Sequence, residues 1–165
     1  MGAGIGVTPF AATLKSIWYK LKDKGNMKLK KVYFYWICKD TKAFEWFQDL
    51  LKVMDDQILQ DGLGNFLEYY IHLTRGWSDR DAKVIMIHDE AGADAVTGLQ
   101  QKTHFGRPKW DTIFEDISKA HPGQDVGVLF CGPKVLSSEL HKQCNRMNQY
   151  SDGSRAKFFY NKENF

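Results

Sequence analysis

An unbroken run of aromatic and branched residues constrains the fold of this chain more than any other feature. Residues Val32–Cys38 are VYFYWIC, without one polar interruption. A strand with one face in water would alternate between apolar and polar residues, whereas a strand in a parallel sheet that is covered on both faces is continuously apolar. A second fully apolar run lies at Val126–Cys131. We therefore predict an α/β fold with a parallel sheet.

Apolar residues at helical spacing fill the intervals between the strands, as a parallel sheet requires of its crossover connections. The predicted helices cover 10–21, 44–54, 110–117 and 136–144, and further strands are predicted at 66–73 and 156–160. With right-handed crossovers, this order gives a three-layer, doubly wound, mostly parallel sheet in one domain, 1–165. The polar stretch Arg75–Thr97 is predicted to be an inserted mobile segment, a gate over the ligand cleft.

A glycine-rich turn opens the chain and leads directly into the first helix. Its glycines let the backbone approach a ligand closely, and the helix N-terminus that follows offers N–H donors to an anion. Since only Met1 precedes the turn, we expect a truncated first strand and a fragment of a longer protein. The turn predicts a pyrophosphate site formed by Gly2, Gly4, Ile5, Gly6, Val7, Thr8 and Pro9.

The end of the second strand indicates which dinucleotide would be bound. No acidic residue stands where one would hold a ribose 2′-hydroxyl; the strand ends instead in Cys38-Lys39-Asp40. A cation at this edge suits a 2′-phosphate, which favours NADPH over NADH.

Several other classes lack their minimum chemistry. The three cysteines are odd in number and form no CxxC pair, and the sequence has no HExxH, GxSxG or P-loop motif. No apolar run approaches the roughly 20 residues of a membrane span, so we expect this piece to be soluble. The formal charge of +3 is mild, so we predict no nucleic-acid partner and interpret Lys28, Lys30 and Lys31 as a solvated strand entry.

Six motifs, in order and over nearly the whole chain, resemble the NADPH-binding half of the NADPH oxidases, within the ferredoxin–NADP⁺ reductase superfamily. The phagocyte-type members are the most similar. The motifs are GAGIGVTPF at 2–10, FYWICKD at 34–40 with FEWF at 44–47, TGL at 97–99, HFGRP at 104–108, FCGP at 130–133 and the terminal ENF at 163–165.

The resemblance implies a domain on the cytosolic face of a membrane, beside a flavin domain and a transmembrane part with two haems. NADPH would give a hydride to FAD, and electrons would pass through haem to oxygen, making superoxide or hydrogen peroxide. Cytosolic regulatory subunits would be further partners. Without the flavin domain, the fragment alone is expected to be inactive.

The resemblance also assigns roles to individual residues. Lys39 and Arg107 match the cations that hold the 2′-phosphate, although many members carry Arg at the position of Lys39. Cys131, Gly132 and Pro133 would lie beside the nicotinamide. Glu163 would orient the carboxamide, and the ring of Phe165 would cover the flavin until nicotinamide displaces it. Cys131, Glu163 and Phe165 are thus the predicted catalytic residues.

Two alternatives remain open at this point. The domain could be a docking module in which NADPH binding orders the inserted segment and exposes a surface to regulators. It could also be the NADPH-binding half of a soluble flavin reductase. The sequence itself does not distinguish either of them from the oxidase interpretation.

Overall fold

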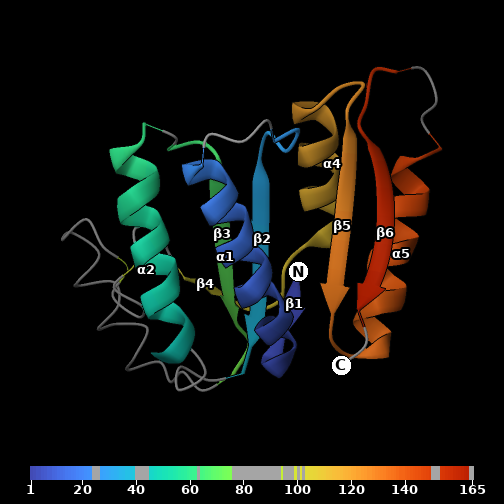
Figure 1. Cartoon of the computed structure of the whole chain (residues 1–165). Coiled ribbons are helices and arrows are strands. Elements are labelled where there is room, and N and C mark those ends of the chain that lie inside the picture. Colours follow the sequence, from blue (N-terminus) through green and yellow to red (C-terminus); the bar gives the residue numbers. More distant parts are fainter. Residues whose placement is uncertain are drawn as a thin grey trace. The chain divides into compact units, whose positions relative to one another are not determined.

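The computed structural model describes residues 1–23, 27–39, 45–62, 64–75, 94, 99, 101, 103–149 and 153–163. The chain divides into two compact units. The first unit comprises Met1–Gly6 and Pro108–Phe165, and the second comprises Val7–Arg107. Within each unit, the strands that the structure describes pair in parallel (Figure 1). The predicted α/β class with a parallel sheet is confirmed.

The second unit carries three strands in the order β4-β3-β2. Its elements are α1 (Thr8–Lys22), β2 (Val32–Cys38), α2 (Glu45–Gln60), β3 (Leu67–Leu73) and β4 (His104–Phe105). Periodicity predicts each of these elements except β4. Two residues are too few to show a pattern, so the sequence gives no sign that β4 is a strand.

Helices α1 and α2 pack on one face of β2. The ring of Phe34 lies 6.3 Å from that of Phe10 on α1 and 5.5 Å from that of Phe47 on α2, and Trp36 meets Phe47 edge-on at 5.3 Å. On the opposite face of the strand, Tyr35 is also buried and stacks on Tyr70 of β3 at 4.7 Å. Both faces of β2 are therefore covered, as its continuous apolar sequence predicts.

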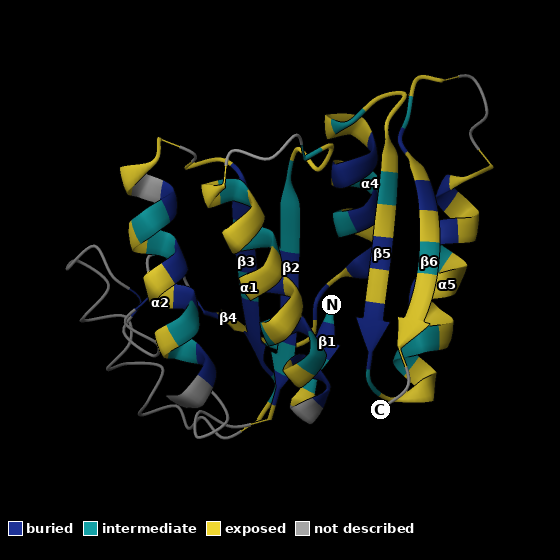
Figure 2. Ribbon diagram, viewed as in Figure 1, coloured by how far each residue is buried: buried dark blue, intermediate teal, exposed yellow. Residues whose placement is uncertain are grey.

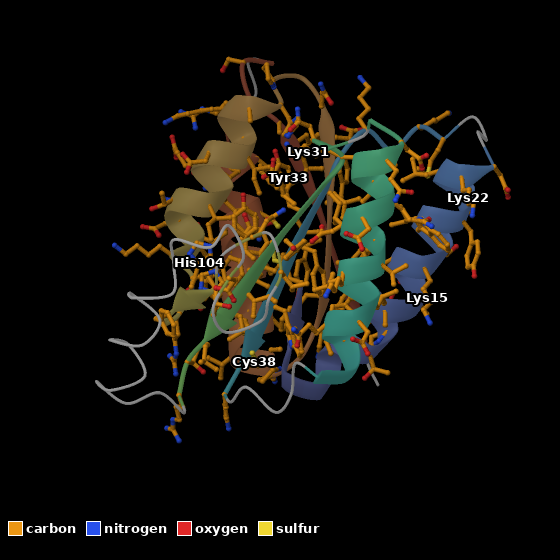
Figure 3. The ribbon with its side chains drawn as sticks, turned by 90° about the vertical axis from the view of Figure 1, so that its left-hand side faces the viewer. Lys15, Lys22, Lys31, Tyr33, Cys38 and His104 are labelled. Carbon is orange, nitrogen blue, oxygen red and sulfur yellow. The ribbon has the colours of Figure 1, made fainter. Side chains whose placement is uncertain are left out.

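The entry to β2 is held by an ion pair. Lys31 contacts the carboxylate of Glu68 on the neighbouring strand, and its ammonium group lies 5.1 Å from the ring centre of Tyr33 (Figure 3). All three lysines were predicted to be solvated. Lys28 and Lys30 are exposed, whereas Lys31 forms an ion pair.

The first unit carries three strands in the order β1-β5-β6. Its elements are β1 (Gly2–Ala3), α4 (Trp110–Ala120), β5 (Asp125–Cys131), α5 (Lys134–Met147) and β6 (Lys157–Glu163). Phe158 of β6 contacts Phe114 of α4 at 5.1 Å, and the Tyr160 hydroxyl donates to Ser137 Oγ of α5 at 2.9 Å. Both helices of this unit therefore contact the same face of β6.

One strand departs from its prediction. Although residues 126–131 of β5 form an apolar run like that of β2, the burial of β5 alternates: Val128 and Phe130 are buried, while Leu129 is 40 % exposed (Figure 2). Phe159 of β6 is likewise 44 % exposed. The helices of the first unit contact one face of its strands, and apolar composition alone does not tell a strand covered on one face from a strand covered on two.

The predicted inserted segment, 75–97, lies mostly outside the described residues. Of its members, Asp94 is buried and its carboxylate accepts hydrogen bonds from the N–H and the hydroxyl of Thr103, both at 2.8 Å. Nearby in sequence, Gln101 Oε1 accepts the N–H of Tyr69 at 2.9 Å. The gate hypothesis stays a prediction. Within the described part of the chain, no helix is both long and apolar enough to cross a membrane.

Candidate functional site

The glycine turn is tied to the end of β5. Gly2 is the register partner of Cys131, whose N–H donates to the carbonyl of Met1 at 3.2 Å. Gly4 has a φ of +58°, a conformation that favours glycine. Gly4–Val7 then form one turn of 3-10 helix, which the sequence did not predict.

Gly6 fits its place only because it lacks a side chain. A Cβ at this position would lie 2.5 Å from the carbonyl oxygen of Cys131 and 3.3 Å from its Sγ. The main chain of the turn therefore lies directly against the strand end. The close approach of this glycine to a ligand stays a prediction, since the contact seen here is with β5.

Helix α1 begins at Thr8 with Pro9 in its first turn, and Val7 takes the N-cap position. Val7 has no side-chain oxygen with which to cap the first N–H groups, and it makes no such bond. Thr8 is exposed and is the first helical residue, one position later than a capping role requires. The side chain of Ile5 lies outside the described part.

Three predicted residues from distant parts of the sequence lie in one row. Cys131 on β5 pairs in register with Gly2 on one side and with Glu163 on the other. Adjacent parallel strands are about 4.8 Å apart, and register partners direct their side chains to the same face. The buried Cys131 thiol therefore lies between the glycine turn and the exposed carboxylate of Glu163. Phe165 lies outside the described residues.

The turn after Cys131 is equally close-packed. Gly132 has a φ of +154°, and a Cβ there would lie 2.8 Å from the ring of Phe130 and 2.9 Å from the Cβ of Ala3. Pro133 follows as the N-cap residue of α5. The small residues after β5 thus let β1 and β5 end side by side.

A second cluster of predicted residues lies at the carboxyl edge of the second unit. Cys38, Leu73 and Phe105 are register partners, so Lys39, Thr74 and Arg107 all leave the sheet at the same edge. Figure 3 shows Cys38 at that end of β2, away from Lys31. Lys39 and Arg107 are both exposed. Their backbones leave strands about 10 Å apart, a span that two long side chains can bridge around one phosphate.

Thr74 was missed by sequence reasoning. Its N–H and its hydroxyl both donate to the carbonyl of Cys38, at 2.9 and 3.0 Å. It thereby fixes the end of β2, from which Lys39 departs. The available signal was a hydroxyl residue directly after a buried strand.

The turn that carries Arg107 is fixed from β3. The N–H of Gly106 donates to the carbonyl of Leu73 at 2.9 Å, and the Gly106 carbonyl lies 3.3 Å from Nδ1 of His72. His72 is buried and stacks on His104 at 5.0 Å. Burial, and then the neighbouring His104, lower the pKa of His72 to about 4, so its imidazole is neutral near pH 7.

Cys38, Cys131 and Cys144 are all buried and free of disulfide bonds. Burial raises the pKa of Cys144 to about 11, which keeps its thiol protonated. Cys144 is buried on α5, and its structural role stays a prediction. Among the described residues, no group of three or more His, Cys, Asp or Glu side chains is arranged to hold a metal ion.

Comparison with known proteins decides the family. The family model described as "Ferric reductase NAD binding domain" matches residues 1–145. The chain belongs to this family. It is also 49% identical to NADPH oxidase 3 of Homo sapiens, 46% to NADPH oxidase 1 of Mus musculus and 44% to a superoxide-generating NADPH oxidase heavy chain of Dictyostelium discoideum.

These relatives cover the whole of this ferric reductase NAD-binding domain, which spans 28–31% of their own length. The resemblance to the NADPH-binding half of the NADPH oxidases is thereby confirmed. The family is described as NAD-binding, and each of these three relatives is named an NADPH oxidase.

Proposed function

We propose that this domain binds NADPH and delivers its hydride to FAD held by an adjacent domain. In this proposal the domain lies on the cytosolic face of a membrane. The electrons then pass through haem in a transmembrane part of the same protein to oxygen, giving superoxide or hydrogen peroxide. The family match and the names of the relatives support the proposal.

The pyrophosphate is assigned to the glycine turn and the start of α1. Gly4 and Gly6 keep the turn free of side chains, so that its main chain can approach the phosphate oxygens. The 2′-phosphate is assigned to Lys39 and Arg107. Both are exposed cations at one sheet edge. Charge-assisted hydrogen bonds to phosphate are stronger than hydrogen bonds between neutral groups.

The nicotinamide is assigned to the row that contains Cys131 and Glu163. The side chain of Cys131 is small and lies at the end of β5, where it leaves room for a ring, and the Glu163 carboxylate can accept hydrogen bonds from the carboxamide. Hydride transfer removes two electrons and one proton together from NADPH and leaves NADP⁺; the flavin supplies the acceptor. The protein's contribution is therefore position and exclusion of water.

The observation that carries this proposal is the register Gly2–Cys131–Glu163, because it unites the phosphate-binding turn with the two residues assigned to the nicotinamide. The test has two stages. The chain is first titrated with NADPH and NADH, and it is then linked covalently to the flavin domain of one of its oxidase relatives, where the tether gives a high effective concentration.

Preferential binding of NADPH together with flavin reduction in the linked protein supports the proposal. Tight NADPH binding without flavin reduction would favour the docking module instead. No binding of either nucleotide would overturn both. Cytosolic regulatory subunits are proposed as further partners, and a pull-down with and without NADPH tests them.

A further inference from the structure

The second unit contains a buried histidine that takes no part in the assigned ligand contacts. His72 lies on β3, on the face opposite to α1 and α2, in a row of rings. Tyr70 stacks on Tyr35, His104 lies 5.8 Å from Tyr70, and His72 stacks on His104. A neutral, buried imidazole within an apolar strand needs a hydrogen-bond partner. The carbonyl of Gly106 is in position to be that partner.

That carbonyl belongs to the peptide unit that joins Gly106 to Arg107. A peptide unit is planar, so fixing the direction of its C=O also fixes the direction of the N–H of Arg107. The other side of Gly106 is fixed as well, since its own N–H donates to Leu73. Gly106 has a φ of +90°, outside the range that most residues adopt. Without these two bonds, glycine would have many other conformations available.

We propose that His72 is the positioning residue for Arg107 and thereby sets the selectivity of the domain for a nucleotide that carries a 2′-phosphate. The imidazole donates through Nδ1–H to the Gly106 carbonyl, and His104 holds the ring by stacking. Arg107 then leaves β4 in the direction of the edge from which Lys39 also departs. The inference rests on the proposed function, because it takes Arg107 as a ligand of the 2′-phosphate.

The neutral state of His72 is part of this arrangement. A neutral imidazole carries one N–H, and the contact with a carbonyl, which can only accept, places that proton on Nδ1. The lowered pKa of His72 keeps this state at neutral pH.

The test uses the full chain and measures the ratio of NADPH affinity to NADH affinity. His72→Leu places an apolar side chain of similar volume at this position and removes the Nδ1–H donor. We expect this variant to lower the ratio by about two- to tenfold, the equivalent of one hydrogen bond, while its affinity for NADH is unchanged. If His72 had a purely structural role, the substitution would lower the affinities for NADPH and NADH by the same factor, and that result would overturn the proposal.

Two amide variants test whether the selectivity depends on a donor at the position of Nδ1. His72→Asn places an N–H₂ group near the position of Nδ1, whereas His72→Gln places it near that of Nε2. The ratio should be retained in His72→Asn and lowered in His72→Gln. Equal ratios in both variants would contradict the assignment of Nδ1. His104→Phe is the matched control, since it keeps a stacked ring and leaves the bond to Gly106 in place; its ratio should match that of the unaltered chain.

Arg107→Ala distinguishes this inference from the function on which it rests. If Arg107→Ala leaves the ratio unchanged, the assignment of the 2′-phosphate fails. If it lowers the ratio while His72→Leu does not, the assignment stands and the positioning role is wrong. With both correct, adding His72→Leu to Arg107→Ala produces no further loss of selectivity, because the two residues act through one contact.

Discussion

The carbonyl oxygen of Cys131 lies 2.5 Å from the point that a Cβ on Gly6 would occupy. That separation is shorter than nonbonded carbon and oxygen atoms tolerate, and the oxygen belongs to the main chain, so a side chain at position 6 must displace either the turn or β5. Overpacking of this kind costs about 1–3 kcal/mol.

We therefore predict that Gly6→Ala lowers NADPH and NADH affinity equally, and that Gly6→Val abolishes binding. Both effects arise because the turn can no longer present its main chain to the pyrophosphate. Gly127→Ala is the matched control, since a Cβ there meets no atom within 4 Å. Isothermal titration with both nucleotides checks the prediction, and unchanged affinity in a folded Gly6→Val protein would contradict it.

Arg107→Ala should lower NADPH affinity by about tenfold or more and leave NADH affinity nearly unchanged. A charge-assisted contact of this kind is worth roughly 1.5–3 kcal/mol before screening by salt. Lys109→Ala removes an exposed charge close by in the sequence and should have little effect on either nucleotide. Lys39→Arg should raise the affinity for NADPH and leave that for NADH unchanged, because a guanidinium group can bind a phosphate through two N–H groups. Equal losses for both nucleotides in Arg107→Ala would refute the assignment.

Glu163→Gln should slow flavin reduction in the linked protein by about tenfold while leaving the dissociation constant of NADPH unchanged, since a small misplacement of reacting groups is costly. Lys162→Gln is the control, because the neighbouring side chain points to the opposite face of β6. Stopped-flow reduction of the flavin measures the rate. Replacement of Phe165 by Ser should also change that rate, as the predicted flavin cover is lost.

Packing of the second unit gives a test that is independent of ligand. Phe47 on α2 is fully buried against β2, so Phe47→Ala should lower the free energy of unfolding by about 3–5 kcal/mol. Val53 lies on the same helix and is 52 % exposed. Val53→Ala should change the free energy of unfolding by less than about 0.5 kcal/mol. Urea denaturation followed by tryptophan fluorescence compares the two variants.

Periodicity was sufficient to predict four helices and four of the strands, because each of them repeats its pattern over several residues. It could not reveal β4, which has two residues, or the one-sided burial of β5, which depends on where the helices pack. Strand β6 continues to Glu163 although its sequence turns polar after Tyr160. Its last residues are held by pairing with β5, and a single sequence carries no record of that pairing.

In the candidate site, the sequence likewise indicated the residue types but not which residues lie together. Glycines and cations were recognisable as residue types that suit phosphate. The row formed by Gly2, Cys131 and Glu163 depends on strand register across the whole length of the chain. His72 is a polar residue in an apolar strand, and only the register of β3 with β4 brings it to Gly106. Residue type indicates what a site could bind, and register determines which residues share it.

The bond between Gln101 and Tyr69 has a consequence for association between molecules. β3 has seven residues but pairs with β4 through only two of them, so among the described residues much of its outer edge has no strand beside it. Such an edge is a template for a strand from another molecule. By accepting the N–H of Tyr69, the Gln101 side chain takes up one of the donors through which such a strand would pair.

Gln101→Leu should therefore leave nucleotide affinity intact but make the chain aggregate at lower concentration. Light scattering over a dilution series would detect this aggregation. Gln124→Leu, on the exposed turn before β5, is the control.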